Sequence, residues 1–176
     1  MAAHKGHASA QYELGRMHNY GWGTDKDSST AFKWYFIAAN EGHALSCHAL
    51  ASLYRKGEGT VKSFAEAFYW EMLAAELGHE NSYYRVGEAY LGGAGVNKDT
   101  NKAILWLMKA FQSKDKLIRS SAAGMLGLIY ENGLGIPSDF DKSFSFHSKA
   151  LEDDNWPSAN ALAYMYIQGY GVEVNY

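Results

Sequence analysis

Residues 50–75 read LASLYRKGEGTVKSFAEAFYWEMLAA, and this stretch decides the fold. Small and apolar residues before Gly57 recur at the spacing of one helix face, and so do those after Ser63. Gly57 and Gly59 lie between the two segments, where glycine favours a left-handed end to a helix. The stretch therefore predicts two helices joined by a Gly-x-Gly turn.

The same template returns along the whole chain. The first glycine of each Gly-x-Gly pair lies at Gly21, Gly57, Gly93, Gly133 and Gly169, at steps of 36, 36, 40 and 36 residues. One aromatic slot keeps this phase, with the residues Trp34, Trp70, Trp106 and Phe146, and one alanine slot does so with Ala38, Ala74, Ala110 and Ala150. Self-similarity at this period is typical of helical repeat arrays. The pattern predicts an all-α chain built of helix-turn-helix repeats of about 36 residues.

The units and helices can be placed from these slots. The array has units at about 7–42, 43–78, 79–115 and 116–154, a half unit at 155–176, and the tail of a preceding unit at 1–6. The first helices are expected at 7–20, 43–56, 79–92, 118–132 and 157–168, and the second helices at 28–41, 64–77, 100–112 and 140–152. Side chains suited to helix N-caps precede the second helices: Asp27, Ser63, Asp99 and Asp139. The four extra residues within 112–119 fit one added helical turn or a longer loop.

Composition narrows the class of protein. The chain has 176 residues, of which 47% are hydrophobic and 20% charged, so a packed core is expected. Its net charge of −3 argues against nucleic-acid binding, and no apolar run is long enough to insert directly into a membrane. The start of the sequence lacks a signal-type apolar segment, and Cys47 is the single cysteine. These features favour a cytoplasmic location.

Two segments of the chain show a pattern that is known from a family of repeat proteins. They are Leu126-Gly127-x2-Tyr130-x2-Gly133-x-Gly135 and Gly95-Val96-x2-Asp99-x3-Ala103-x2-Trp106-x3-Ala110. This pattern resembles the Sel-one-like repeat, a relative of the tetratricopeptide repeat, over essentially the whole chain. The resemblance implies a right-handed α-solenoid that scaffolds or adapts protein assemblies, so we expect a non-catalytic protein–protein interaction scaffold, a fragment of a longer repeat protein, with no cofactor. A cysteine-rich branch of the family is linked to β-lactam binding, but its paired cysteines are absent here.

A partner is expected on the concave face of the solenoid, on slots of the first helices that do not repeat. These predicted partner-binding residues are Tyr12, Arg16, Tyr20, His48, Ser52, Arg55, Lys56, Tyr84, Glu88 and Tyr164. Tyr and Arg dominate binding hot spots, so the pattern predicts an extended or helical peptide with acidic and apolar character. The expected anchors are Tyr12, Arg16, Arg55 and Tyr84, clustered near the first two units. Alternatively, Arg55 and Lys56 only complement a helix dipole and the tyrosines cover the core.

Other functions have weaker support in the sequence. His43, Cys47 and His48 share one helix and suggest a metal site, but His43 occupies the same repeat slot as His7 and His79, which favours a structural role. Ser113-x-x-Lys116 matches one motif of serine β-lactamases, which makes a hydrolase or small-ligand binder the alternative function. The companion motifs of those enzymes are absent, so this alternative has weaker support. Neither end shows a polar cap, which predicts a longer array, a covering partner or self-association through the ends.

Overall fold

The computed structural model describes residues 7–171, and the elements in this part of the chain are helices. In chain order they are α1 (Ala8–Tyr20), α2 (Ser28–Asn40), α3 (Ala44–Lys56), α4 (Phe64–Glu76), α5 (Glu80–Gly92), α6 (Thr100–Phe111), α7 (Lys116–Asn132), α8 (Phe140–Glu152) and α9 (Trp156–Gln168). The expected tail at 1–6 and the N-cap slot expected at Asn175 lie outside the described residues.

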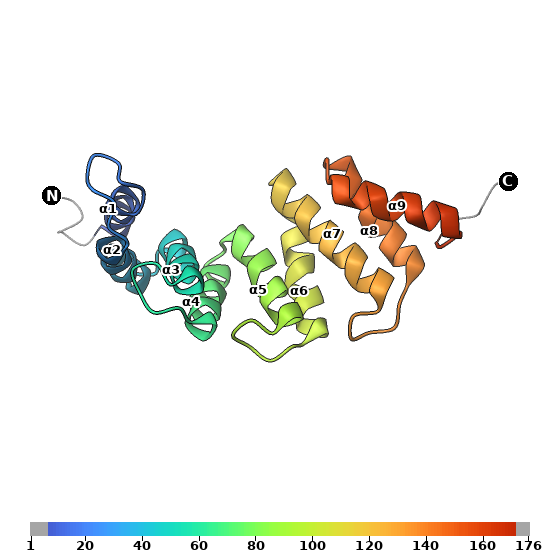
Figure 1. Ribbon diagram of the computed structural model, residues 1–176, viewed down its shortest axis with the longest axis horizontal. Coiled ribbons are helices and arrows are strands. Elements are labelled where there is room, and N and C mark those ends of the chain that lie inside the picture. Colours follow the sequence, from blue (N-terminus) through green and yellow to red (C-terminus); the bar gives the residue numbers. More distant parts are fainter. Residues whose placement is uncertain (1–6, 172–176) are drawn as a thin grey trace.

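The helices form pairs that stack along one direction. The most extensive packing joins α1 to α2, α3 to α4, α5 to α6 and α7 to α8, and each pair then packs on the next. Figure 1 shows the pairs following a shallow arc, with α1, α3 and α9 toward its inner side. The prediction of an all-α solenoid is therefore confirmed.

The turns behave as the glycine spacing predicts. Each first helix ends at a glycine in the left-handed conformation, for example Gly57 at φ 75° and Gly93 at φ 76°. The second helices begin with side-chain caps, because Asp27 accepts hydrogen bonds from the backbone N–H groups of Ser29 and Thr30 and Ser63 accepts one from Glu66. Asp99 and Asp139 cap α6 and α8 in the same way. These caps satisfy N–H groups that a helix leaves without an internal partner.

The core follows the small-residue slots more closely than the aromatic slot. Ala38, Ala74, Ala110 and Ala150 are fully buried. The expectation that the aromatic slot is core holds fully only for Trp70, which is 5% exposed. Trp34 and Trp106 are half-buried, and Lys109 places its ammonium 3.9 Å from the ring centre of Trp106. The wide indole rings therefore cover the edge of the helix pair, while the alanines let the helices approach.

The four inserted residues form an added turn at the start of α7. This helix has 17 residues, whereas α3 and α5 each have 13. Asp115 caps its first turn by accepting from the N–H groups of Leu117 and Ile118. Arg119 then donates to both carboxylate oxygens of Asp153, at 2.6 and 2.8 Å, and ties the added turn to the loop before α9.

Candidate functional site

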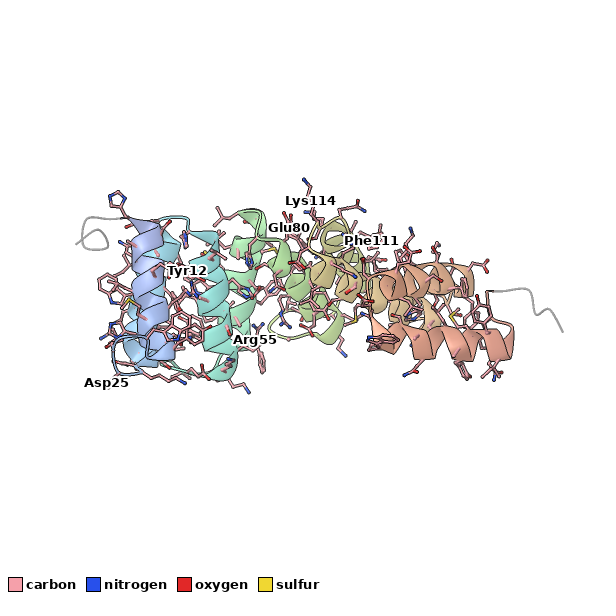
Figure 2. The ribbon with its side chains drawn as sticks, turned by 90° about the horizontal axis from the view of Figure 1, so that it is seen from above. Tyr12, Asp25, Arg55, Glu80, Phe111 and Lys114 are labelled. Atoms are coloured by element: carbon pink, nitrogen blue, oxygen red, sulfur yellow. The ribbon has the colours of Figure 1, made fainter. Side chains whose placement is uncertain are left out.

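The inner side of the arc contains a hollow between α1, α2 and α3, which we call the N-terminal hollow. Its volume is about 250 Å³. Six of the predicted partner-binding residues line it: Tyr12, Arg16, Tyr20, His48, Ser52 and Lys56. Figure 2 shows this side of the molecule, with Tyr12 and Arg55 labelled on it. The helix-face offsets read from the sequence therefore bring these side chains together.

Positive charge surrounds the N-terminal hollow. Arg16, Lys26 and Lys56 line it together with one carboxylate, Glu58, which lies 4.0 Å from Lys56. The guanidinium of Arg16 is held over the Trp22 ring, 5.0 Å from its centre, and pairs with Glu13 at 3.2 Å. Contact with an aromatic face leaves a guanidinium oriented while its N–H groups stay available. The hollow is thus suited to an acidic group flanked by aromatic surface.

Two of the predicted residues belong to a second hollow, between α3, α4 and α5, which we call the central hollow. Its volume is about 350 Å³, and its charged lining residues are Arg55, Glu71, Arg85 and Glu88. Phe64, Ala67, Phe68 and Ala89 form apolar parts of its wall. The expected single cluster of anchors is therefore wrong in this respect, because Arg55 lines a different hollow from Tyr12 and Arg16.

Tyr84 lines a third hollow, which we call the C-terminal hollow. This hollow has a volume of about 210 Å³, and its lining includes Tyr84, Ser121, Gly124, His147, Asn155 and Ser158. Tyr84 therefore does not lie beside the anchors of the first two units, as the sequence suggested. It faces α7 and α9 because each helix pair is displaced along the arc from the one before it. Tyr164 lies on α9, is 51% exposed and is absent from the linings of the three hollows.

One buried slot that varies from unit to unit was not predicted from the sequence. It directly follows the aromatic slot and holds Tyr35, Glu71, Leu107 and His147, each at most 3% exposed. Glu71 lies 3.9 Å from Arg55, and His147 lies 3.4 Å from Glu131, so the slot holds a carboxylate beside a cation in one unit and an imidazole beside a carboxylate in another. The signal was present in the sequence as a changing residue type between constant core slots.

His147 shows what a polar residue in this slot does. Asn155 donates its side-chain N–H to the Ser120 carbonyl, and its oxygen accepts from the Ser158 hydroxyl at 3.2 Å. The hydroxyl oxygen is then free to accept from Nδ1 of His147, at 3.1 Å. Burial lowers the pKa of His147 below its ordinary value, and nearby Glu131 opposes this effect. His147 is therefore a buried neutral group that joins α8 to α9.

The metal and hydrolase candidates each have separate structural partners. His43 Nδ1 lies 2.9 Å from the Ser46 hydroxyl, His48 Nδ1 lies 2.7 Å from Glu71, and Cys47 is buried, which raises its thiol pKa to about 11. Within residues 7–171, no group of three or more His, Cys, Asp or Glu residues is placed to hold a metal ion. Ser113 donates to Glu80, whereas Lys116 pairs with Asp154 at 2.6 Å.

Membrane insertion has no candidate element in the described part of the chain. The helices between residues 7 and 171 fall short of the length and apolar character that a membrane crossing requires.

Comparison with known proteins identifies the repeat. The family model described as Sel1 repeat matches residues 8–43, 44–79, 81–115, 120–155 and 156–176. No curated protein matches the chain significantly. A protective antigen of uropathogenic Escherichia coli with an SLR fold is similar at 31% identity and a TM-score of 0.91, over 99% of this chain and 37% of that protein. This chain thus spans little more than a third of the antigen's length.

Two further crystal structures share the architecture. A Sel1 repeat protein from Oxalobacter formigenes is 27% identical with a TM-score of 0.89, over 97% of this chain and 69% of that one. A Sel1 repeat protein from Klebsiella pneumoniae, 22% identical with a TM-score of 0.60 over 99% of this chain and 83% of that one, shares the fold. With family matches in every unit from residue 8 to 176, the chain belongs to the Sel1 repeat family.

Proposed function

We propose that the chain is a non-catalytic scaffold that binds a partner protein or peptide on the inner side of its arc. Sel1 repeats commonly mediate protein–protein interaction, which supports this class of function. The observation that carries the proposal is the N-terminal hollow, where Tyr12, Arg16 and Lys56 meet in one concave surface. Aromatic and guanidinium groups of this kind provide most of the binding energy in protein interfaces.

The arrangement and charge of the hollows favour a peptide over a small ligand. Three hollows of about 210, 350 and 250 Å³ follow one another along the array. Two of these three are smaller than the ~300–1,000 Å³ usual for a small-molecule site. Separate hollows suit the successive side chains of an extended segment. The cations of the N-terminal hollow favour an acidic residue in the segment, next to an apolar one.

Selection of peptides on the immobilised chain tests the proposal. Peptides from a random library would be enriched, and their affinities measured by fluorescence anisotropy. We expect enrichment of acidic residues next to apolar ones. The double variant Arg16→Ala, Lys56→Ala removes two cations of the N-terminal hollow and should weaken binding about tenfold, which corresponds to about 1.4 kcal/mol.

A matched double variant provides the control. Lys33 and Lys149 are exposed on second helices, so Lys33→Ala, Lys149→Ala removes the same charge away from the three hollows. This control should keep the affinity of the selected peptides. Equal affinity of both double variants, or selection of peptides without acidic residues, would contradict the proposed binding surface.

A further inference from the structure

The central hollow contains a carboxylate that is buried in the helix core. Glu71 is only 3% exposed, yet it lines this hollow together with Arg55 and Arg85. A carboxylate removed from water is costly unless hydrogen bonds compensate the lost hydration. The hydrogen bonds of the two Glu71 oxygens show how much of the lost hydration the protein replaces.

One oxygen of Glu71 is fully engaged. Oε1 accepts from the Ser82 hydroxyl at 2.7 Å and lies 2.7 Å from Nδ1 of His48. Since Ser82 donates its only proton to Glu71, Nδ1 of His79, 2.8 Å from the Ser82 oxygen, donates to that hydroxyl. This chain of hydrogen bonds fixes the orientation of the carboxylate across α3, α4 and α5.

The other oxygen has no hydrogen bond within the described part of the protein. Oε2 of Glu71 is buried, and the Nη1 atom of Arg55 lies 3.9 Å away, beyond hydrogen-bond distance. An acceptor in this position costs the desolvation of the group without a compensating bond. A donor placed beside Glu71 in the central hollow would supply the missing hydrogen bond.

A donor in the lining of the same hollow is also unsatisfied. The Nε atom of Arg85 is buried and has no hydrogen-bond partner among residues 7–171, although its Nη1 donates to Glu88 at 3.0 Å. The charged groups of the hollow balance, with Glu71 and Glu88 against Arg55 and Arg85. A fully charged ligand would find no net opposite charge. A neutral group that carries both a donor and an acceptor would satisfy both buried atoms.

We propose that the central hollow is a subsite for a carboxamide side chain, asparagine or glutamine, of the bound partner. A primary amide carries N–H donors and a carbonyl acceptor on one carbon. Its N–H donates to Oε2 of Glu71, its carbonyl accepts from Nε–H of Arg85, and its methylene stem lies against the ring of Phe68. The inference rests on the proposed peptide-binding function and specifies one of its contacts.

Nuclear magnetic resonance with short probes tests this subsite directly. The probes are capped pentapeptides Gly-Gly-X-Gly-Gly in which X is glutamine, glutamate, lysine or leucine. The readout is the Nε–H resonance of Arg85, identified by its loss in Arg85→Lys. The glutamine probe should produce a saturable shift of this resonance, larger than that from the other three. A larger shift from the lysine or glutamate probe, or no saturable shift from glutamine, overturns the proposal.

Two further variants separate recognition from folding. Glu71→Gln keeps an acceptor for Ser82 and His48 but replaces the acceptor Oε2 by an amide NH2 donor, so the glutamine probe should lose its effect. Glu76→Gln makes the same change at an exposed position of α4 and should retain it. Circular dichroism checks that both variants are folded. An undiminished shift in a folded Glu71→Gln protein overturns the proposal.

A variant with lower structural risk gives an independent check. Arg85 is partly exposed, and Arg85→Lys keeps the positive charge while removing Nε–H. Shifts of backbone amides in α4 and α5 caused by the glutamine probe should be lost in this variant, and their persistence would contradict the assigned donor. Failure here, with peptide selection on the N-terminal hollow still succeeding, would leave the proposed function standing.

Discussion

At the scale of single residues, two glycines with the same left-handed backbone conformation differ in the space around them. Gly78 has φ 87° and open space where a Cβ would stand. Gly95 has φ 78°, but a Cβ there would overlap the carbonyl of Phe64 at the start of α4. Gly78 is therefore required only for its left-handed conformation. Gly95 is also required because a larger side chain would not fit, since this turn lies against the preceding second helix, α4.

The two glycines predict different losses of stability. Gly78→Ala should reduce the free energy of unfolding by about 1–2 kcal/mol, the cost of a left-handed alanine. Gly95→Ala should reduce it further, since a backbone oxygen cannot move aside as a flexible side chain can. Urea unfolding followed by circular dichroism measures both. Equal losses would mean that the close approach at Gly95 contributes nothing.

The half-buried His79 predicts a dependence of stability on pH. Burial lowers the pKa of His79 below the ordinary histidine value of 6.5, and the nearby His48 lowers it further. The unfolded chain therefore binds a proton before the folded protein does, so the contribution of His79 is present above pH 6.5 and is lost as the pH falls toward the folded-state pKa. Stability measured by urea unfolding should decrease between pH 7.5 and pH 5.

His79→Asn isolates this contribution. Asparagine is the natural residue in the equivalent slot, where Asn155 accepts from the Ser158 hydroxyl, and its side-chain N–H groups allow it to donate to Ser82 as His79 does. The variant should stay folded at pH 7.5 and lose less stability on acidification than the original protein. An unchanged slope of stability against pH would rule out His79 as a source of the effect.

At the scale of elements, the extra turn of α7 depends on one cap. Asp115 accepts from the N–H groups of Leu117 and Ile118, at 2.8 and 3.2 Å, in a segment that the other first helices lack. The sequence allowed either an added turn or a longer loop. The cap, together with the ion pair between Arg119 and Asp153, explains why the inserted residues form an added helical turn rather than a longer loop.

Removal of the cap should destabilise the start of α7. Asp115→Ala should cost about 1 kcal/mol, the usual contribution of an N-cap side chain. Asp25→Ala, at an exposed loop position labelled in Figure 2, is the control and should change stability by less than about 0.5 kcal/mol. Thermal unfolding of the two variants compares them, and equal melting temperatures would contradict the capping role.

At the scale of the whole molecule, stability comes from neighbouring units, as in other repeat arrays. Ala51 of α3 is fully buried in a cluster that includes Trp70 and Ala74 of α4. Its equivalent on α9, Ala163, is exposed. Ile167, also on α9, is 78% exposed. The packing around α9 is therefore thinner than that around α3.

Hydrogen exchange should report this difference. Amides in the middle of α9, near Leu162, should exchange at least about tenfold faster than those near Leu50 of α3, which corresponds to about 1.4 kcal/mol of opening free energy. Mass spectrometry of the intact chain, digested after labelling, provides the measurement. Equal protection of α3 and α9 would show that unfolding is concerted across the array.

Periodicity alone determined the repeat, the approximate limits of the helices apart from the start of α7, their glycine ends, the caps of the second helices, and six residues of the N-terminal hollow. These features depend on local conformation and on offsets along one helix, which the order of residues encodes directly. The sequence did not group Tyr84 correctly, and it gave no role to Glu71. Which hollow receives a side chain depends on how far each helix pair is displaced from the last. Whether a buried carboxylate oxygen finds a donor depends on α3, α4 and α5 together, and only the tertiary structure brings those three helices into contact.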